Sequence, residues 1–307
     1  MGNWVGHVGA GFGFFIIGLW HLLSHIKLHA QNPNSHKPFL WFPIQKLRYL
    51  ELYLIMGGTT VMIAMELFIT QRRHQPLEPD FTIPSTHLHN FEHSIIALAF
   101  FIYATFAIIF DKIAPKKTQH SLTHLLLAAA FGQQLLVFHL HSTDHEGLEG
   151  EYHLLLQLVI SIALVATLMG IGYPKSFLIS FVRSMSIVSL GVWLVVLGIM
   201  LWTPELIPKG CFMDLDKGNK VVRCHNDEAL ERAKSLVNLE FSWYMILVII
   251  SSMCLYLYMI KIYAEKAAQY QTLSKYASKE DEEGDEDVEA QKKTKVDESK
   301  SKNGGKC

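Results

Sequence analysis

One stretch of the sequence, FHLHSTDHEGLEGEYH at residues 138–153, holds four histidines and four acidic residues in sixteen positions. The sequence on both sides of it is strongly apolar and nearly without charge. Imidazole groups beside carboxylates are typical ligands of Zn, Fe, Cu or Ni, and histidine also exchanges protons near neutral pH. The stretch therefore indicates a metal or haem site, a proton relay, or a polar layer at a membrane surface.

A second histidine-rich stretch, HLHNFEH, lies at residues 87–93, and the two stretches hold seven of the sixteen histidines in the chain. His89 and His93 are four residues apart, and so are His141 and His145. Side chains at this spacing lie on one face of a helix. Each stretch is thus able to present a pair of imidazoles to a common site.

The order of residues within the first stretch limits which side chains converge. His139 and His141 are two positions apart, so on a continuous helix they point in different directions. Glu149 precedes His153 by four positions, which suits a carboxylate that orients an imidazole from outside the ligand shell.

The composition is that of a membrane protein. Half of the 307 residues are hydrophobic and only 18% are charged, whereas roughly 25% of residues are charged in soluble domains. About 20 consecutive apolar residues cross a bilayer as a helix. Such segments occur at approximately 5–25, 48–70, 90–110, 121–141, 153–172, 182–202 and 241–262. We therefore predict an all-α, polytopic integral membrane protein with seven transmembrane helices in a domain of residues 1–263.

Alternation of seven spans brings the histidine stretches together. We call the side of the membrane that holds the N-terminus side A and the opposite side B. The third and fifth spans begin on side A, and the fourth ends there. His7 and Glu66 lie at the same level. The predicted metal ligands are His93, His139, His141 and His153, with His89, His145 and Glu149 as outer candidates.

Several kinds of chemistry fit this set. Three histidines with an open position form a catalytic zinc site, whereas two histidines on facing helices hold a haem. A proton or ion relay, or a transporter, needs polar groups that continue through the bilayer, and Gln133 and Gln134 are the obvious mid-span candidates. A polar layer that bonds loops and headgroups needs no cofactor. Catalytic residues are not assigned, and whether the protein is an enzyme stays open.

Other polar residues in the spans have simpler interpretations. His21, His25 and His29 repeat every four residues at the side B end of the first span, which is typical of an amphipathic exit from the membrane. Arg183 begins the sixth span, and long basic side chains at helix ends extend to the interface. We do not expect His21, His25 and His29 to form a ligand set.

The first span has two further features. Gly9 and Gly13 form a GxxxG spacing, which lets helix backbones approach closely in lipid. We interpret it as packing within the chain, with a dimer interface as the alternative. Neither Lys nor Arg precedes the apolar run from Val5 to Leu23, and a signal peptide normally has such a charge. We expect a retained membrane helix.

Basic residues predict the orientation. Nine Lys and Arg lie in the loops of side B or at the adjoining starts of the spans, against two in the short loops of side A. The long loop 203–240 adds six to side A, but short loops are the ones that set orientation. We predict an extracytoplasmic N-terminus and a cytoplasmic C-terminus, in an endomembrane or in the plasma membrane.

The 203–240 loop contains Cys211 and Cys224. A disulfide between them requires an oxidising compartment, which agrees with an extracytoplasmic side A. We predict this bond; the alternative is two free thiols.

Residues 264–307 are rich in Lys, Asp and Glu and nearly lack apolar residues. Such a segment is predicted to be disordered, as a solubilising tail or as a binding segment for protein partners. The net charge is −1, and nucleic-acid binding, which needs a concentrated basic surface, is not expected.

The chain resembles the transmembrane protein 45 family, a seven-span family of unknown function. The resemblance is closest to the plant branch, which shares GQQLLVFHLHSTDHEG and IPKGCFMDL. The vertebrate branch is similar at His93, His139, His141 and His153 but lacks His145. The family implies a multi-pass fold without an established reaction. The other matching stretches are GHVGAGFGFFIIGLWH (6–21), YLELYLIMGGTTVMIAMELF (49–68), HLHNFEHS (87–94), YHLLLQL (152–158) and VRSMSIVSLGVWLVVLGIMLWTP (182–204).

Overall fold

The computed structural model describes residues 4–31, 47–69, 75–140, 147–216 and 219–263. Within these ranges seven helices are long and apolar enough to cross a membrane, which confirms the predicted fold class. They are α1 (Trp4–Gln31), α2 (Leu50–Ala64) continued by the π-helical turn η2 (Met65–Ile69), α3 (Leu88–Ile113) preceded by the 3-10 turn η3 (Ser85–His87), α4 (Lys116–Leu140), α5 (Gly147–Gly172), α6 (Phe177–Trp202) and a seventh helix (Asp227–Tyr263). The 3-10 turn η4 (Pro204–Leu206) and the strands β1 (Cys211–Asp216) and β2 (Asn219–Cys224) join α6 to the seventh helix.

The chain divides into two compact units, Met1–Tyr256 and Leu257–Cys307. The first unit contains α1–α6, the hairpin and most of the seventh helix. The described part of the second unit is the end of that helix, at 257–263. The predicted tail, 264–307, lies outside the described residues.

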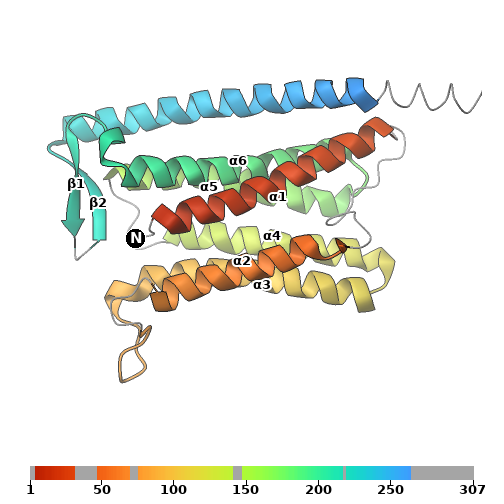
Figure 1. Ribbon diagram of the computed structural model, residues 1–307, viewed down its shortest axis with the longest axis horizontal. Helices are drawn as coiled ribbons and strands as arrows, with labels where there is room; N and C mark the ends of the chain where they lie inside the picture. Colours follow the sequence, from red (N-terminus) through yellow and green to blue (C-terminus); the bar gives the residue numbers. More distant parts are fainter. Residues whose placement is uncertain (1–3, 32–46, 70–74, 141–146, 217–218, 264–307) are drawn as a thin grey trace, which may run out of the picture. The chain divides into compact units, whose positions relative to one another are not determined.

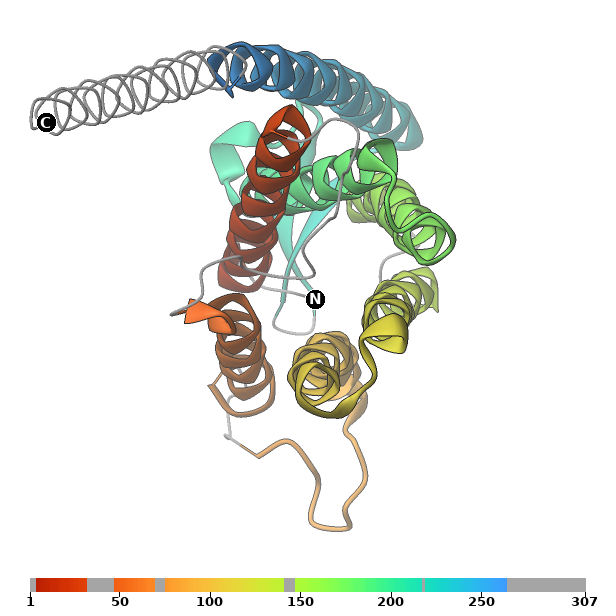
Figure 2. The same cartoon turned by 90° about the vertical axis from the view of Figure 1, so that its right-hand side faces the viewer.

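Helices α1–α6 form a closed ring within the first unit (Figures 1 and 2). Each helix contacts the next one along the chain, and α1 closes the ring by packing on α6. The α1–α6 contact is the most extensive in the ring, and the α1–α2 contact is the smallest. The seam between α1 and α2 is therefore the place where the ring is least tightly closed.

Glycines allow the close approach of α1 to α6. A Cβ at Gly11 would lie 2.7 Å from the Gly191 carbonyl oxygen, and a Cβ at Gly18 would lie 2.6 Å from the Val188 nitrogen. By contrast, a Cβ at Gly9 or Gly13 would have no atom within 4 Å. The interpretation of Gly9 and Gly13 as internal packing positions is wrong, because the packing glycines occupy the other face of α1.

Aromatic side chains fill the interior between α5, α6 and the seventh helix, and their polar atoms form hydrogen bonds. Trp193 on α6 is fully buried, and its Nε1 donates to the Tyr152 carbonyl oxygen at 3.2 Å. Tyr152 in turn donates its hydroxyl to Glu240 at 2.8 Å. Tyr244 donates to the Ser189 carbonyl oxygen at 2.6 Å. These bonds satisfy the polar ends of large buried side chains, which is what a membrane interior requires.

At the side B ends of α2, α3 and α4, Asp111 collects three donors. Arg48 and Gln119 each donate to its carboxylate at 2.6 Å, and Tyr49 does so at 2.5 Å. The hydrogen bond to Asp111 raises the pKa of the Tyr49 phenol. One carboxylate thus fixes three helix ends relative to one another.

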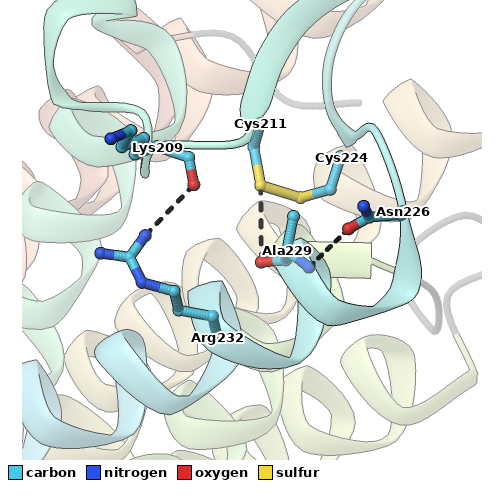
Figure 3. The surroundings of a disulfide bond; sticks show 6 residues. All are labelled: Lys209, Cys211, Cys224, Asn226, Ala229 and Arg232. Atoms are coloured by element: carbon cyan, nitrogen blue, oxygen red, sulfur yellow. Dashed lines mark hydrogen bonds between the residues drawn. A yellow bond between two sulfur atoms is a disulfide. The ribbon is translucent and has the colours of Figure 1, made fainter.

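The hairpin packs against α5 and α6 through β2. Its strands are antiparallel, and Cys211 lies directly opposite Cys224 in the register. The two form a disulfide with an S–S distance of 1.96 Å (Figure 3). The Cys211 sulfur lies 3.9 Å from the carbonyl oxygen of Ala229 in the first turn of the seventh helix.

The seventh helix begins at Asp227, well before the apolar segment predicted from residue 241. Asn226 caps it, because its side-chain oxygen accepts from the Ala229 backbone nitrogen at 2.8 Å. Arg232 donates to the Lys209 carbonyl oxygen at 3.2 Å (Figure 3). Residues 227–240 are good helix formers but too polar for a hydropathy criterion, so the sequence prediction assigned them to a loop.

Candidate ligand-binding site

A cavity of about 500 Å³ lies between the helices of the ring. Residues of α1, α2, η2, α3, α4 and α6 line it, and most of its wall is apolar. Aromatic side chains such as Phe14, Phe100 and Phe131 form part of this wall. The volume lies within the range of roughly 300–1,000 Å³ that is usual for small-molecule sites. Its polar side chains gather mainly at two levels, one on side A and one on side B.

The polar group at the His7 level, here called the side A cluster, consists of His7, Glu66, Asn90, His93 and His153, all of them buried. The π-helical turn η2 carries Glu66 at the end of α2. Glu66 accepts a hydrogen bond from the Asn90 amide at 2.7 Å, and its other oxygen lies 3.5 Å from the His93 Nδ1. The carboxylate therefore lies beside two positions of α3 and is hydrogen-bonded to one of them.

His7 links the histidines of the side A cluster. Its ring centroid lies 6.0 Å from that of His93 and 5.9 Å from that of His153. The Trp202 ring packs against the His7 ring, with 5.0 Å between the two centroids. The His153 Nδ1 lies 2.9 Å from the Glu149 carbonyl oxygen. Because a carbonyl only accepts, this nitrogen carries the hydrogen in the neutral ring, and Nε2 is then the accepting nitrogen.

The structure distributes the predicted site residues unevenly. His93 and His153 both approach His7, whereas His139 is exposed near the end of α4. His89 is half-buried, and its ring lies 6.4 Å from that of His93. Glu149 is buried, and its backbone carbonyl supplies the contact to His153 described above.

His141 and His145 lie outside the described residues. In the part of the chain that the structure describes, no three or more His, Cys, Asp or Glu side chains form a group that could hold a metal ion. Zinc needs nitrogens at about 2.0–2.1 Å from the metal. As arranged, the side A cluster is a group of buried histidines beside a carboxylate that accepts a hydrogen bond from Asn90, and the metal site stays a prediction.

The second polar group, here called the side B cluster, consists of His21, Glu51, His124 and Arg183, and all four line the cavity. The His21 Nε2 lies 2.7 Å from a Glu51 carboxylate oxygen. Arg183 is 6% exposed and contacts the His124 Nε2. The other ring nitrogen of His124 lies 3.1 Å from the His120 carbonyl oxygen.

Two sequence interpretations are wrong here. Arg183 does not extend to the interface but is buried inside the ring. His21 and His25 do not belong to an exposed amphipathic exit, because His25 is buried and His21 pairs with Glu51. The sequence did contain a signal for this cluster. Glu51 and Arg183 are single ionisable residues in apolar helices, and such residues often mark a functional site.

Two further polar side chains lie on the cavity wall. Gln134 and Thr123 on α4 are each 2% exposed. The side-chain oxygen of each has no hydrogen-bond partner among the described residues. Gln157 bonds across helices to the Phe138 carbonyl oxygen at 3.5 Å, as expected of an amide in lipid.

Glycines line the cavity where α1 and α2 meet. Gly9 and Gly13 on α1 and Gly57 and Gly58 on α2 belong to the wall, and all four are exposed. A Cβ at any of them would have no atom within 4 Å. The least tightly closed seam of the ring is thus also bordered by residues without side chains.

The family model that describes a family of unknown function (DUF716) matches residues 120–257. This stretch begins in α4 and ends in the seventh helix, and it contains His153, Arg183 and both disulfide cysteines. DUF716 is the family model that matches transmembrane protein 45 proteins, which agrees with the resemblance seen in the sequence. The function of this family is unknown, so function is argued from the site itself.

Proposed function

We propose that this multi-pass membrane protein binds an elongated, largely apolar ligand inside its helical ring. The observation that carries the proposal is the cavity of about 500 Å³, with an apolar wall and a polar cluster at each end. His7 and His21, one in each cluster, are fourteen residues apart on α1. At about 1.5 Å per residue the two levels are roughly 20 Å apart along the helix. A membrane-soluble molecule with an apolar body matches this shape.

The ligand enters from the lipid through the seam between α1 and α2. The exposed glycines on both helices, Gly9, Gly13, Gly57 and Gly58, leave this part of the cavity wall without side chains. A passage between helices suits a molecule that is already dissolved in the bilayer.

The side A cluster is proposed to lie at the extracytoplasmic face, in an endomembrane or in the plasma membrane. The excess of basic residues in the short loops of side B supports this orientation, and so does the disulfide, which requires an oxidising compartment. Membership of the plant branch of the transmembrane protein 45 family stays a prediction from the shared stretches.

A transition-metal or haem site at the side A cluster is the second candidate. The observation that favours it is the approach of His7 to both His93 and His153. Elemental analysis and visible absorbance of purified protein decide it: a stoichiometric metal or a Soret band would support it, and their absence would reject it. A proton relay is disfavoured, because the wall between the clusters is mainly apolar.

The ligand proposal is tested by photo-crosslinking. Protein in neutral-lipid nanodiscs is irradiated with hexadecanol carrying a diazirine near the end of its chain. The labelled peptides are expected to come from α1, α2, α3 and α4. Gly57→Trp places a large side chain at the seam, where a Cβ meets no atom, and should reduce labelling about tenfold.

The matched control is Gly172→Trp. Gly172 also has open space around its Cβ position and does not line the cavity. Labelling should be unchanged in this variant. Labelling that is spread evenly over the exposed outer face of α5, or that is equal in the two variants, would contradict the proposal.

A further inference from the structure

Arg183 is an unusual residue for its place in the fold. It lies in a helix long and apolar enough to span the membrane, is 6% exposed, and lines the cavity. A buried cation in a membrane interior is costly, and such residues normally pair with a carboxylate or mark a ligand counter-ion. The partners of its guanidinium therefore decide what it does.

The described residues provide Arg183 with no carboxylate partner. Its side-chain hydrogen bond goes to His124. Glu51 lies on the same cavity wall, but its carboxylate is bonded to His21 at 2.7 Å and forms no ion pair with Arg183 among the described residues. The guanidinium has five N–H donors, so one bond to an imidazole leaves most of its donor capacity for other acceptors.

His124 positions the guanidinium without neutralising it. A guanidinium only donates, so the His124 Nε2 must be the acceptor. The Nδ1 then carries the hydrogen and donates to the His120 carbonyl oxygen at 3.1 Å. His124 is consequently neutral and fixed in one tautomer. Thr123, next to it in sequence, also lines the cavity, and its hydroxyl has no hydrogen-bond partner among the described residues.

We propose that Arg183 binds the acidic headgroup of the cavity ligand, which is a single-chain lipid with a carboxylate or phosphate group. The proposal rests on the proposed function, because it assigns the chemical class of the ligand in the same cavity. A guanidinium matches the geometry of both anions. The alkyl chain of the ligand extends along the apolar wall towards the side A cluster. The Thr123 hydroxyl is available to the headgroup as a second donor.

The test measures binding of three radiolabelled probes that share one alkyl chain length: palmitate, hexadecyl phosphate and hexadecanol. The protein is the full chain in neutral-lipid nanodiscs. A charge-assisted hydrogen-bonded contact strengthens binding by about 10- to 100-fold. Palmitate or hexadecyl phosphate should therefore bind about 10-fold or more tightly than hexadecanol, and the tighter of the two identifies the headgroup.

Arg183→Gln should lower the affinity for the anionic probe to that for hexadecanol and leave hexadecanol binding unchanged. Arg183→Lys, which keeps the charge without the planar fork, should give an intermediate affinity. Arg232→Gln is the control, because Arg232 is an exposed arginine of the seventh helix and lies away from the cavity lining. It should bind all probes as the unmodified protein does.

The outcomes separate the two proposals. Hexadecanol bound as tightly as both anions, or anion binding unchanged in Arg183→Gln, would overturn the anionic headgroup and leave the cavity ligand standing. Failure of all three probes to bind would overturn the proposed function itself. Hexadecanol binding also reports whether Arg183→Gln is folded. If it is not, the comparison of probes on the unmodified protein decides the question.

Discussion

The two ends of the cavity are built from similar groups but differ in one respect. In the side A cluster, Glu66 accepts a hydrogen bond from the neutral amide of Asn90 and lies 3.5 Å from the His93 Nδ1. In the side B cluster, Glu51 is bound by His21, and a permanent cation, Arg183, lies on the same wall. A neutral histidine beside a carboxylate has a charge of −1 and becomes neutral on taking up one proton, whereas a guanidinium keeps its charge. Side B is therefore the end suited to a fixed anion.

The substitution with the largest predicted effect, Gly18→Leu, tests whether both clusters depend on the position of α1. This helix carries His7 and His21 and is packed on α6 at Gly18. Gly18→Leu would push side-chain atoms into the backbone of α6, at a cost of about 3 kcal/mol or more. The variant should lose probe binding and should have a lower melting temperature, which fluorescence-detected gel filtration after heating measures. Gly172→Leu, with open space at its Cβ and away from the cavity lining, is the control, and equal destabilisation by both would contradict the packing of α1 on α6.

Loss of the disulfide should destabilise the side A end of the ring and leave the side B cluster unchanged. The hairpin that carries it packs against α5 and α6, and a cross-link of this loop length contributes about 3 kcal/mol. In the double variant Cys211→Ser, Cys224→Ser, hydrogen exchange should rise in the hairpin and at the start of α5 but not around His21. Mass spectrometry of the unreduced protein should show the linked peptides. Alkylation of both thiols in unreduced protein would reject the bond.

A pair of isosteric substitutions sharpens the comparison between the clusters. Glu51→Gln removes the carboxylate that contacts His21 and lies on the same cavity wall as Arg183, and we expect a loss of about 2 kcal/mol in delipidated protein. Glu66→Gln leaves no permanent cation unpaired in its cluster and should cost about 1 kcal/mol. Chemical or thermal unfolding of both variants measures the difference. The reverse order of destabilisation would refute the distinction between the two ends.

The smallest predicted effect separates buried from exposed histidines. His139→Ala should change stability by less than about 0.5 kcal/mol, because the side chain is exposed. His153→Ala removes a buried ring that contacts His7 and bonds the Glu149 backbone, and should cost about 1–2 kcal/mol. Thermal unfolding of the two variants in one detergent provides the comparison. An effect of His139→Ala as large as that of His153→Ala would contradict the exposed position of the His139 side chain.

The sequence predicted the parts of the fold that depend on apolar length. Seven apolar segments became seven helices, and alternation correctly brought His7 and Glu66 to the level of His93. It did not predict the side B cluster, because hydropathy does not tell which face of a helix turns inward. Arg183 near a helix end looks the same in sequence whether it reaches the interface or faces a cavity.

The π-helical turn that carries Glu66 has no comparable sequence signal, and neither does the start of the seventh helix at Asp227. Asn226 caps this helix at its start, whereas the polarity of residues 227–240 alone suggests a loop. The GxxxG pattern misled for a related reason. Its spacing identifies residues on one helix face but not which partner that face meets, and the neighbouring Gly11 and Gly18 supply the contact with α6.

We propose that the ring encloses a lipid-like ligand between the two clusters. Cryo-electron microscopy of the protein in nanodiscs made from its native membrane tests this most directly. The map should show an elongated density inside the ring, with one end against Arg183 and the other directed towards His7. A ring in which α1 and α2 close together and side chains fill the space would contradict the claim.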